Sequence, residues 1–431
     1  MLDKFFRLKE RGTTVGTELL AGLTTFLTIA YIFIVNPAIL ADAGMNFDGV
    51  FMATILTTAL ATLIMALFSN YPIVIGPGMG LNAYFTYTIV LTQGFTWQAA
   101  LGAVFVTGVL FVIISLTPLR AMLIDAIPAS LKYAITAGIG LFIAFIGLQS
   151  TKIVVDSPSS LVAVGNFRDP VTLLSMIGLI LSVVLLVFRV RGSLFIGMII
   201  TSIIAYAMGM MDLPGSLFAW PQGFETTAFQ LDITGVFEHG LYAIVFTYLL
   251  VILFETTGSL LGLAEQAGLM KGEHFPRSRG AYLADALGTT VGSVLGTSPT
   301  TAYMESGAGI AVGGRTGLTG VFAAGLILLT MFFAPVANML SAIPAVTTPP
   351  LIIVGFLMME GLKHLNWSDM EEAFPVFLIL LLIPLTYSIS TGIGVGFIVY
   401  VLIKILRGKA RQVHPILYLF SLLFLVQIAL A

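Results

Sequence analysis

The sequence has no cysteine and little charge. Only 9% of its 431 residues are charged and 58% are hydrophobic, whereas a soluble domain carries about 25% charged residues. Without cysteine, disulfides, thiolate metal sites and cysteine nucleophiles are excluded. The four histidines are isolated and show no HExxH-type spacing, which disfavours a zinc enzyme. The net charge of −2 gives no sign of a nucleic-acid partner.

Long apolar segments dominate the chain instead, and several exceed the roughly 20 residues that a helix needs to cross a bilayer. We therefore predict an all-α polytopic membrane protein with fourteen membrane spans. The spans are 16–41, 49–69, 71–92, 97–117, 129–149, 171–188, 193–211, 238–264, 281–296, 297–312, 317–339, 346–362, 373–388 and 391–407. A last apolar segment, 414–430, either crosses the membrane or lies in its interface.

The basic residues predict the orientation of these spans. The N-terminal residues 1–12 are basic and no signal-peptide cleavage site follows, so we expect a cytoplasmic N-terminus. With that start, seventeen of the nineteen Lys and Arg residues, Lys271 among them, fall on the cytoplasmic side. Only Lys152 and Arg168 fall outside, as the positive-inside rule predicts. The polar connections 150–170 and 212–237 lie outside and are too short to be domains.

The two halves of the chain resemble each other. MGLNAY at 79–84 aligns with SPTTAY at 298–303, and the same offset places Asn36 opposite Glu255. These short matches predict two repeats of seven spans each. Because seven is odd, the second repeat must enter the membrane from the opposite side, which is typical of transporters that bind their substrate near the midplane.

Two predicted spans contain helix-breaking residues at matching positions. The span 71–92 contains Gly76-Pro77-Gly78 after a run of β-branched residues, and the span 297–312 contains Ser298-Pro299. Each predicts a short extended piece followed by a half-helix. Such a backbone persists in a membrane only where protein or a polar cavity surrounds it, and half-helix N-termini offer free N–H groups to acceptors on a neutral ligand. The alternative is that these residues only permit close helix packing.

Two carboxylates, Glu255 and Glu305, lie well inside predicted spans, and no Lys or Arg lies deep in a span to neutralise them. Desolvation favours the neutral form of such an acid, which suits proton coupling. The alternative is a protonated glutamate that only bonds a neighbouring helix. We interpret Asp285 as a helix-end or interface residue. Asn82 can donate and accept hydrogen bonds and Tyr303 can stack, so a small, planar, polar ligand is predicted.

The motifs GPGMGLNAYF, LFETTGSLLG, LGTSPTTAYMESGAG and GGRTGLTGV resemble the AzgA-like purine permeases of the nucleobase–cation symporter 2 group. The resemblance extends along nearly the whole chain. It implies a uracil-permease-like fold of two inverted seven-span repeats with short strands in spans 3 and 10. It also implies a core domain of residues 1–118 and 238–339 and a gate domain of residues 119–237 and 340–431.

The resemblance also assigns roles to particular residues. Glu255 and Glu305 match the acids that accept hydrogen bonds from the base and link binding to protonation. Asn82 matches the binding asparagine of span 3. Tyr303 and Met304 match positions that flank the base, with Met304 contributing its backbone. This chain has FETTGSL where most relatives have FDTTGTL, so the span-8 acid reaches one methylene further.

We therefore predict a proton-coupled importer of purine nucleobases in a prokaryotic plasma membrane, with a slight preference for hypoxanthine and guanine over adenine. It is predicted to be neither an enzyme nor dependent on a cofactor or metal, and sodium coupling and a homodimer both stay open. The alternative within transport is an anion transporter or channel of the same broad fold, although two unpaired glutamates oppose anions. An intramembrane hydrolase is a third hypothesis, which lacks paired histidines or a metal-ligand set.

Overall fold

The computed structural model describes residues 2–238, 240–270 and 275–430. Two features of the sequence predictions lie outside these residues. They are position 239, within the predicted span 238–264, and Lys271, one of the basic residues assigned to the cytoplasmic side.

The first half of the chain forms helices that follow the seven predicted spans. They are α1 (Leu2–Phe6), α2 (Val15–Ile29), α3 (Ile32–Asp42), α4 (Phe47–Ile64), α5 (Met79–Ala83), α6 (Trp97–Leu116), α7 (Leu119–Asp125), α8 (Ala129–Ser150), α9 (Pro170–Val187) and α10 (Ser193–Ala207). Two π-helical segments, η1 (Met65–Ser69) and η2 (Tyr84–Thr92), continue α4 and α5.

The second half also follows the predicted spans. Its helices are α11 (Ile233–Glu238), α12 (Tyr242–Gln266), α13 (Ser278–Leu295), α14 (Ser306–Ala311), α15 (Gly317–Leu329), α16 (Ala334–Ser341), α17 (Pro344–Leu357), α18 (Met370–Thr386), α19 (Ile389–Leu406) and α20 (Pro415–Leu430). Short 3₁₀ segments are η3 (Phe224–Thr226), η4 (Thr330–Phe333), η5 (Met358–His364) and η6 (Ala410–Gln412).

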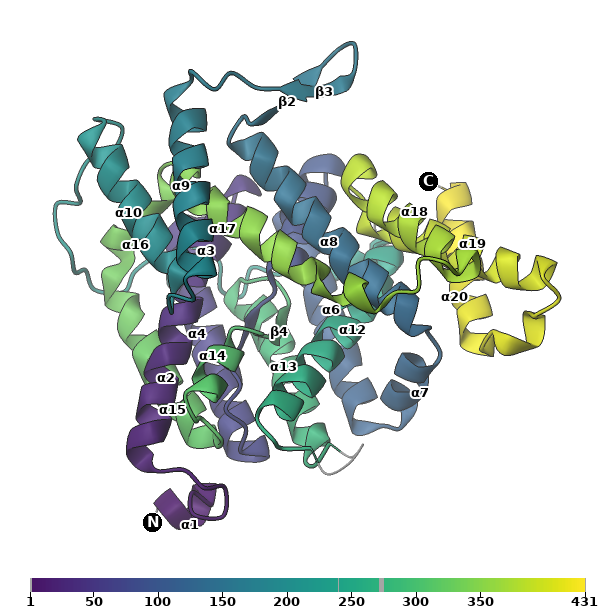
Figure 1. Ribbon diagram of the computed structural model, residues 1–431, viewed down its shortest axis with the longest axis horizontal. Coiled ribbons are helices and arrows are strands. Elements are labelled where there is room, and N and C mark those ends of the chain that lie inside the picture. The colour runs from purple at the N-terminus through teal and green to yellow at the C-terminus, as the bar shows by residue number, and fades with distance from the viewer. Residues whose placement is uncertain (1, 239, 271–274, 431) are drawn as a thin grey trace.

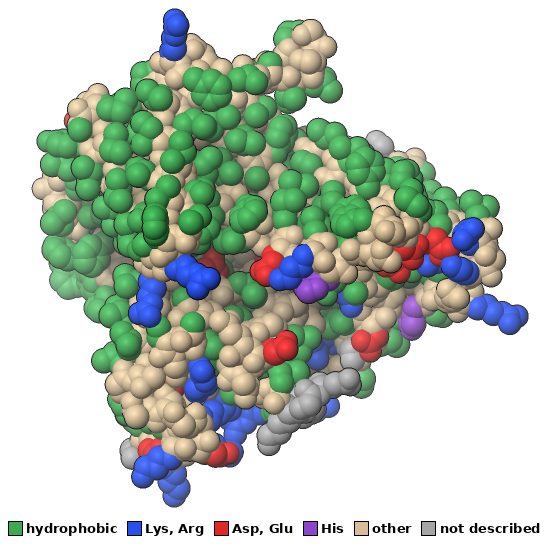
Figure 2. Space-filling view, viewed as in Figure 1, with side chains coloured by type: hydrophobic (Ala, Val, Ile, Leu, Met, Phe, Trp, Pro, Cys, Tyr) green, Lys and Arg blue, Asp and Glu red, His purple; other side chains and the backbone are tan. Residues whose placement is uncertain are grey.

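The helices have the length and composition of membrane spans. Within the described residues, nine helical segments are long and apolar enough to cross a bilayer, and Ser193–Ala207 and Pro415–Ala429 are shorter apolar helices. Large apolar side chains stand exposed on them; Val187 and Phe188 at the end of α9 are 72% and 77% exposed. Figure 2 shows hydrophobic side chains covering the upper part of one face, with charged groups gathered across its middle and lower parts. A surface of this kind requires a lipid environment.

The helices pack in two groups. In one, α15 packs on α2 and α4, while α13 packs on α4 and α6, which also contacts α12. In the other, α17 and α18 pack on α8, α9 packs on α10 and α17, and α19 packs on α18 and α20. Figure 1 shows α18, α19 and α20 together at one side of the molecule and α2, α4 and α15 at the other.

The structure contains two small sheets. Strands β1 (Ile75–Pro77) and β4 (Thr300–Ala302) form the first, as an antiparallel pair. Both lie in the predicted broken spans, so the expected extended pieces are confirmed. Strands β2 (Val154–Ser157) and β3 (Leu161–Val164) form a hairpin inside the connection 150–170, at the end of the molecule away from α1 (Figure 1). The two Val-containing runs of this connection flank a polar turn, which is a hairpin pattern.

Glu18 of α2 holds the start of α15. Its carboxylate is fully buried and accepts hydrogen bonds from the backbone N–H groups of Arg315 (3.0 Å), Thr316 (3.3 Å) and Thr319 (3.1 Å). The Thr319 hydroxyl donates a fourth at 2.5 Å. A carboxylate at a helix N-terminus satisfies N–H groups that have no partner within the helix and interacts favourably with the helix dipole. Glu18 thus fixes α2 against α15 across nearly 300 residues of sequence.

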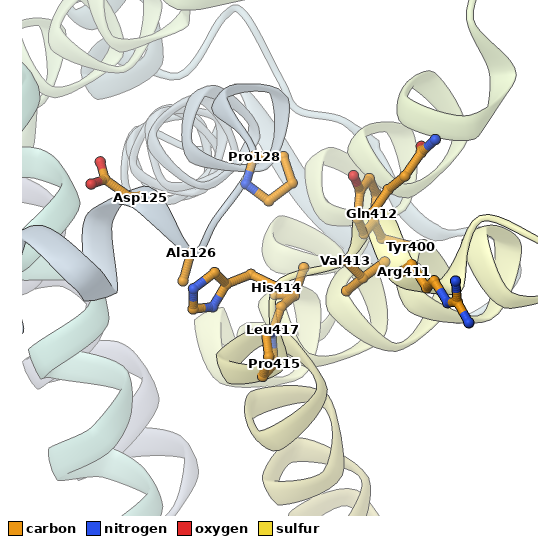
Figure 3. Close-up of a pocket in the computed structure, with 10 residues that line it drawn as sticks. All are labelled: Asp125, Ala126, Pro128, Tyr400, Arg411, Gln412, Val413, His414, Pro415 and Leu417. Atoms are coloured by element: carbon orange, nitrogen blue, oxygen red, sulfur yellow. The ribbon is translucent and has the colours of Figure 1, made fainter.

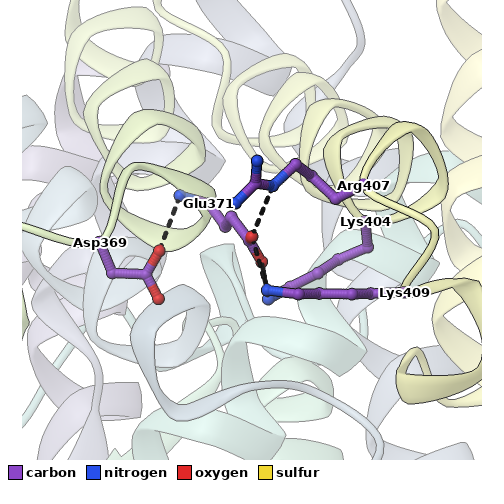
Figure 4. Close-up of polar contacts among 5 residues, drawn as sticks. All are labelled: Asp369, Glu371, Lys404, Arg407 and Lys409. Carbon is purple, nitrogen blue, oxygen red and sulfur yellow. Dashed lines mark hydrogen bonds and ion pairs between the residues drawn. The ribbon is translucent and has the colours of Figure 1, made fainter.

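A second acid, Glu371, fixes the ends of α18 and α19. Figure 4 shows three basic side chains converging on its carboxylate: Lys404 at 2.8 Å, Arg407 at 3.0 Å and Lys409 at 2.6 Å. Glu371 precedes the predicted span 373–388. The hydrogen bond from Lys404, with those from Lys409 and Arg407, lowers the pKa of Glu371 to about 2. Three of the four basic residues at the end of α19 are therefore bound within the protein.

Candidate functional site

The centre of the candidate site is the β1–β4 pair. Its register joins Ile75 to Ala302, Gly76 to Thr301 and Pro77 to Thr300. Helix α5 begins directly after β1 and α14 begins shortly after β4. Because the strands run antiparallel, α5 follows the Pro77 end of the ladder and α14 follows the Ala302 end. Each broken span thus contains a strand followed by a short helix, as predicted.

Asn82 links the two broken spans. It lies on α5, is fully buried, and its carbonyl oxygen accepts a short hydrogen bond from the hydroxyl of Ser298, just before β4. Its amide nitrogen lies 3.6 Å from the sulfur of Met79. Nearby, Asn36 of α3 donates to Thr297 at 3.1 Å. These contacts connect the two broken spans with each other and with α3.

Tyr303 packs over Gly76 and Pro77 of β1. Its hydroxyl donates to the carbonyl oxygen of Pro77 at 2.9 Å, and the side chain is 5% exposed. A Cβ at Gly76 would lie 2.6 Å from that hydroxyl, so the tyrosine ring requires glycine at this position. The next residue, Met304, is 54% exposed. The side chain of Tyr303 therefore lies inside the protein, whereas that of Met304 is exposed.

Glu305 is held by a tyrosine that the sequence analysis did not identify. The hydroxyl of Tyr31 donates to Oε1 of Glu305 at 2.7 Å, and Thr28 donates to the Glu305 backbone carbonyl at 3.3 Å. Tyr31 is fully buried at the break between α2 and α3. In the sequence, Tyr31 is one aromatic residue within an apolar run, and only the fold brings it to a carboxylate 274 residues away.

Glu255 lies on α12, which packs against β4 and α14. Its Oε2 atom is buried and has no hydrogen-bond partner among the described residues. Tyr303 and Glu305 lie between β4 and α14, so the packing of α12 brings Glu255 to the same part of the fold. The fold therefore brings three of the predicted residues together.

The interpretation of Asp285 as a helix-end or interface residue was wrong. It lies inside α13, is fully buried, and accepts hydrogen bonds from the hydroxyls of Thr256 and Thr300, the latter at 2.8 Å. Thr256 follows Glu255 and Thr300 opens β4, so Asp285 positions the helix that carries one acid against the strand of the broken span. Hydrogen bonds from these hydroxyls offset the cost of burying Asp285 in a membrane protein. The position of Asp285 in the sequence did not reveal these partners.

A cavity of about 370 Å³ lies elsewhere, between the connection from α7 to α8 and the connection from α19 to α20. Asp125, Tyr400, Arg411 and His414 are among its lining residues (Figure 3). None of the predicted site residues lines it, so it is separate from the β1–β4 region. In the described part of the chain, no three His, Asp or Glu residues are grouped as metal ligands.

A helical membrane protein with two paired, interrupted helices and acids beside the break has the architecture of a secondary transporter and not of an enzyme. The chain belongs to the Permease family, whose model matches residues 16–395.

Similar proteins extend over almost the full chain. The chain is 52% identical over 428 residues to the guanine/hypoxanthine permease PbuO of Bacillus subtilis (strain 168), covering 98% of this chain and 99% of that protein. It is 42% identical over 436 residues to the guanine/hypoxanthine permease PbuG of the same organism, covering 99% of each. Among solved structures, it resembles the transmembrane domain of the cyanobacterial bicarbonate transporter BicA, with a TM-score of 0.67 and 16% identity over 88% of this chain and 97% of that one. That last similarity concerns the fold alone.

Proposed function

We propose that this transporter imports purine nucleobases, hypoxanthine and guanine first and adenine as a further candidate, by proton symport across the plasma membrane. The observation that carries the proposal is the pair of acids, Glu255 and Glu305, beside the β1–β4 break, with no ion pair to either in the described chain. The names of the two Bacillus relatives, which match over the full length, support purines as the substrate class.

The proposed topology is fourteen spans in two inverted repeats with a cytoplasmic N-terminus. Two features support it. The strands β1 and β4 occupy equivalent places in the two halves and pair antiparallel, as elements related by a two-fold axis in the membrane plane would. Asn36, the repeat counterpart of Glu255, also lies beside the partner half, where it bonds Thr297. The basic residues supply the orientation.

The two packing groups of helices support a division into moving parts. We assign residues 1–118 and 238–339 to a core domain that carries the site, and residues 119–237 and 340–431 to a gate domain. In this scheme the core domain shifts against the gate domain to expose the site to one side of the membrane and then to the other. A homodimer formed through the gate domain is compatible with this motion, and the mass of the detergent-solubilised protein tests it.

In the proposed mechanism the site residues have distinct roles. Glu305, oriented by Tyr31, and Glu255 accept hydrogen bonds from N–H groups of the base. Asn82 donates its amide to a ring acceptor, and the backbone of Met304 binds the opposite edge. The hydroxyl of Tyr303 holds β1 in place by donating to the carbonyl oxygen of Pro77. Glu255 carries the transported proton, because its buried Oε2 has no competing hydrogen-bond donor among the described residues.

Conservative substitution tests the acids. Glu255→Gln and Glu305→Gln should each abolish accumulation of radiolabelled hypoxanthine driven by an inward proton gradient. Glu265→Gln, an exposed acid on the same helix α12, is the matched control and should transport normally. If both site variants accumulate purine like wild type, the assignment fails. Replacing sodium with choline should leave uptake unchanged, whereas a protonophore should stop it.

The alternative of an anion transporter rests on the fold similarity to the bicarbonate transporter. Fold alone does not define a substrate, and two acids at the site repel an anion. Competition separates the two functions. Guanine should inhibit hypoxanthine uptake and bicarbonate or sulfate should not; the reverse result would support the alternative.

A further inference from the structure

A second cavity, of about 210 Å³, lies between the two helix groups, on the side where α3 ends and α17 begins. Its lining includes Asp42, Phe47, Tyr87, Ser150, Thr347 and Thr348. We propose that this cavity is an entry subsite that captures a purine base on the external face before the base reaches the β1–β4 site. The inference rests on the proposed function and orientation, which place the ends of α3, α8 and α16 outside.

The chemistry of the rim fits a neutral, flat molecule with N–H donors. The hydroxyl of Tyr87 donates to Oδ2 of Asp42 at 2.7 Å, which orients the carboxylate. Oδ1 of Asp42 accepts no hydrogen bond from the described residues, and the side chain is exposed. A carboxylate oxygen accepts N–H groups strongly, and it repels anions. The N1–H edge of hypoxanthine or guanine is such a donor.

The remaining lining matches the rest of a purine. Val35, Ile39 and Leu351 are buried apolar side chains on the floor, suited to a ring face. The hydroxyl-bearing residues Thr347 and Thr348 lie on the α17 side and can bond ring nitrogens. The site therefore combines a few polar groups with an apolar floor, which is the usual composition of a small-molecule pocket.

The position of the cavity connects it to the central site. Tyr87 lies on η2, which continues α5 without a break, so Tyr87 is five residues from Asn82 on one helical segment. Thr86 of the same segment donates to the carbonyl of Ile39 at 3.0 Å, and Thr88 donates to the carbonyl of Tyr387, in the proposed gate domain, at 2.6 Å. Because both domains line the cavity, their relative movement would change its size and release a captured base toward Asn82.

Kinetics of external uptake tests the subsite. Asp42→Asn and Tyr87→Phe should raise the external KM for hypoxanthine about tenfold and about threefold, respectively. Vmax should stay within about twofold of wild type, and the equilibrium Kd of the purified protein, which reports the central site, should be unchanged. Asp156→Asn, an acid in the β2–β3 hairpin outside the cavity, is the matched control and should have a wild-type KM.

Each other outcome overturns the proposal. An unchanged KM in both variants means that the cavity captures nothing. An equal increase in KM and in the equilibrium Kd means that these residues act on the central site. A KM defect of Asp42→Asn that disappears when sodium is replaced with choline assigns the carboxylate to a cation. Failure of the proposed function is distinguishable, because wild-type protein would then show no saturable purine uptake.

Discussion

Glu18 provides the most quantitative test of how the transporter is held together. The substitution Glu18→Ala removes one acceptor group from four donors, of which three are backbone N–H groups at the start of α15. The region is fully buried, and each orphaned donor costs about 1–3 kcal/mol when no replacement partner exists. These costs are not additive, because the loop relaxes. We therefore expect a loss of about 3–5 kcal/mol in the free energy of unfolding, which is near the low end of the simple sum for four orphaned donors.

The conservative change Glu18→Gln separates charge from shape. Glutamine fills the same space but replaces one carboxylate oxygen with an NH₂ group, which would face the N–H donors. It also loses the favourable interaction of a negative charge with the N-terminus of α15. About 2 kcal/mol, near half the effect of alanine, is the expected cost.

The assay is denaturant unfolding in mixed micelles, followed by tryptophan fluorescence and repeated with bound purine. Glu10→Gln is the matched control, because Glu10 is 67% exposed and its one ion pair within the described residues is with Arg7, at 3.7 Å. Surface pairs of this kind contribute about 0–1 kcal/mol, so this variant should be almost indistinguishable from wild type. If Glu18→Ala loses less than about 1 kcal/mol, the four hydrogen bonds do not fix α2 to α15 and the argument is wrong.

Three further predictions concern the candidate site and the contact between α18 and α19. Tyr31→Phe should remove about 1.5–3 kcal/mol of hydrogen bonding to Glu305 and reduce hypoxanthine uptake at least tenfold, with the folded protein retained; normal uptake would show that the bond is dispensable. Gly76→Ala should force Tyr303 away from its position, lowering stability by about 1–3 kcal/mol and stopping uptake, as measured by thermal unfolding and transport. The stabilising contribution of the charged Glu371 is complete above the ordinary glutamate pKa of about 4.3 and declines as the pH falls toward 2. Wild type should therefore lose more free energy of unfolding than Glu371→Gln when the pH is lowered from 6 to 3.

The sequence alone determined where most helices lie and where two of them break. Apolar runs of span length can satisfy their backbone hydrogen bonds in a membrane only as helices, so composition predicted a helical membrane protein. Glycine and proline act locally through the backbone, which is why Gly76-Pro77-Gly78 and Ser298-Pro299 predicted β1 and β4. Glu255 and Glu305 were predicted as site residues because acids are costly in apolar surroundings wherever the chain folds.

The tertiary structure decided which groups meet. Tyr31 bonds Glu305, and Asp285 bonds hydroxyls on two other segments; these contacts join residues up to 274 positions apart. Hydrogen bonds over that separation depend on how helices pack, and a single sequence contains no signal for that packing. The β2–β3 hairpin is a different case, since its strand pattern is local to residues 154–164 and was present in the sequence. Local interactions along the chain thus determine the helices and strands. Which side chains meet at the candidate site depends on how those elements pack in the complete fold.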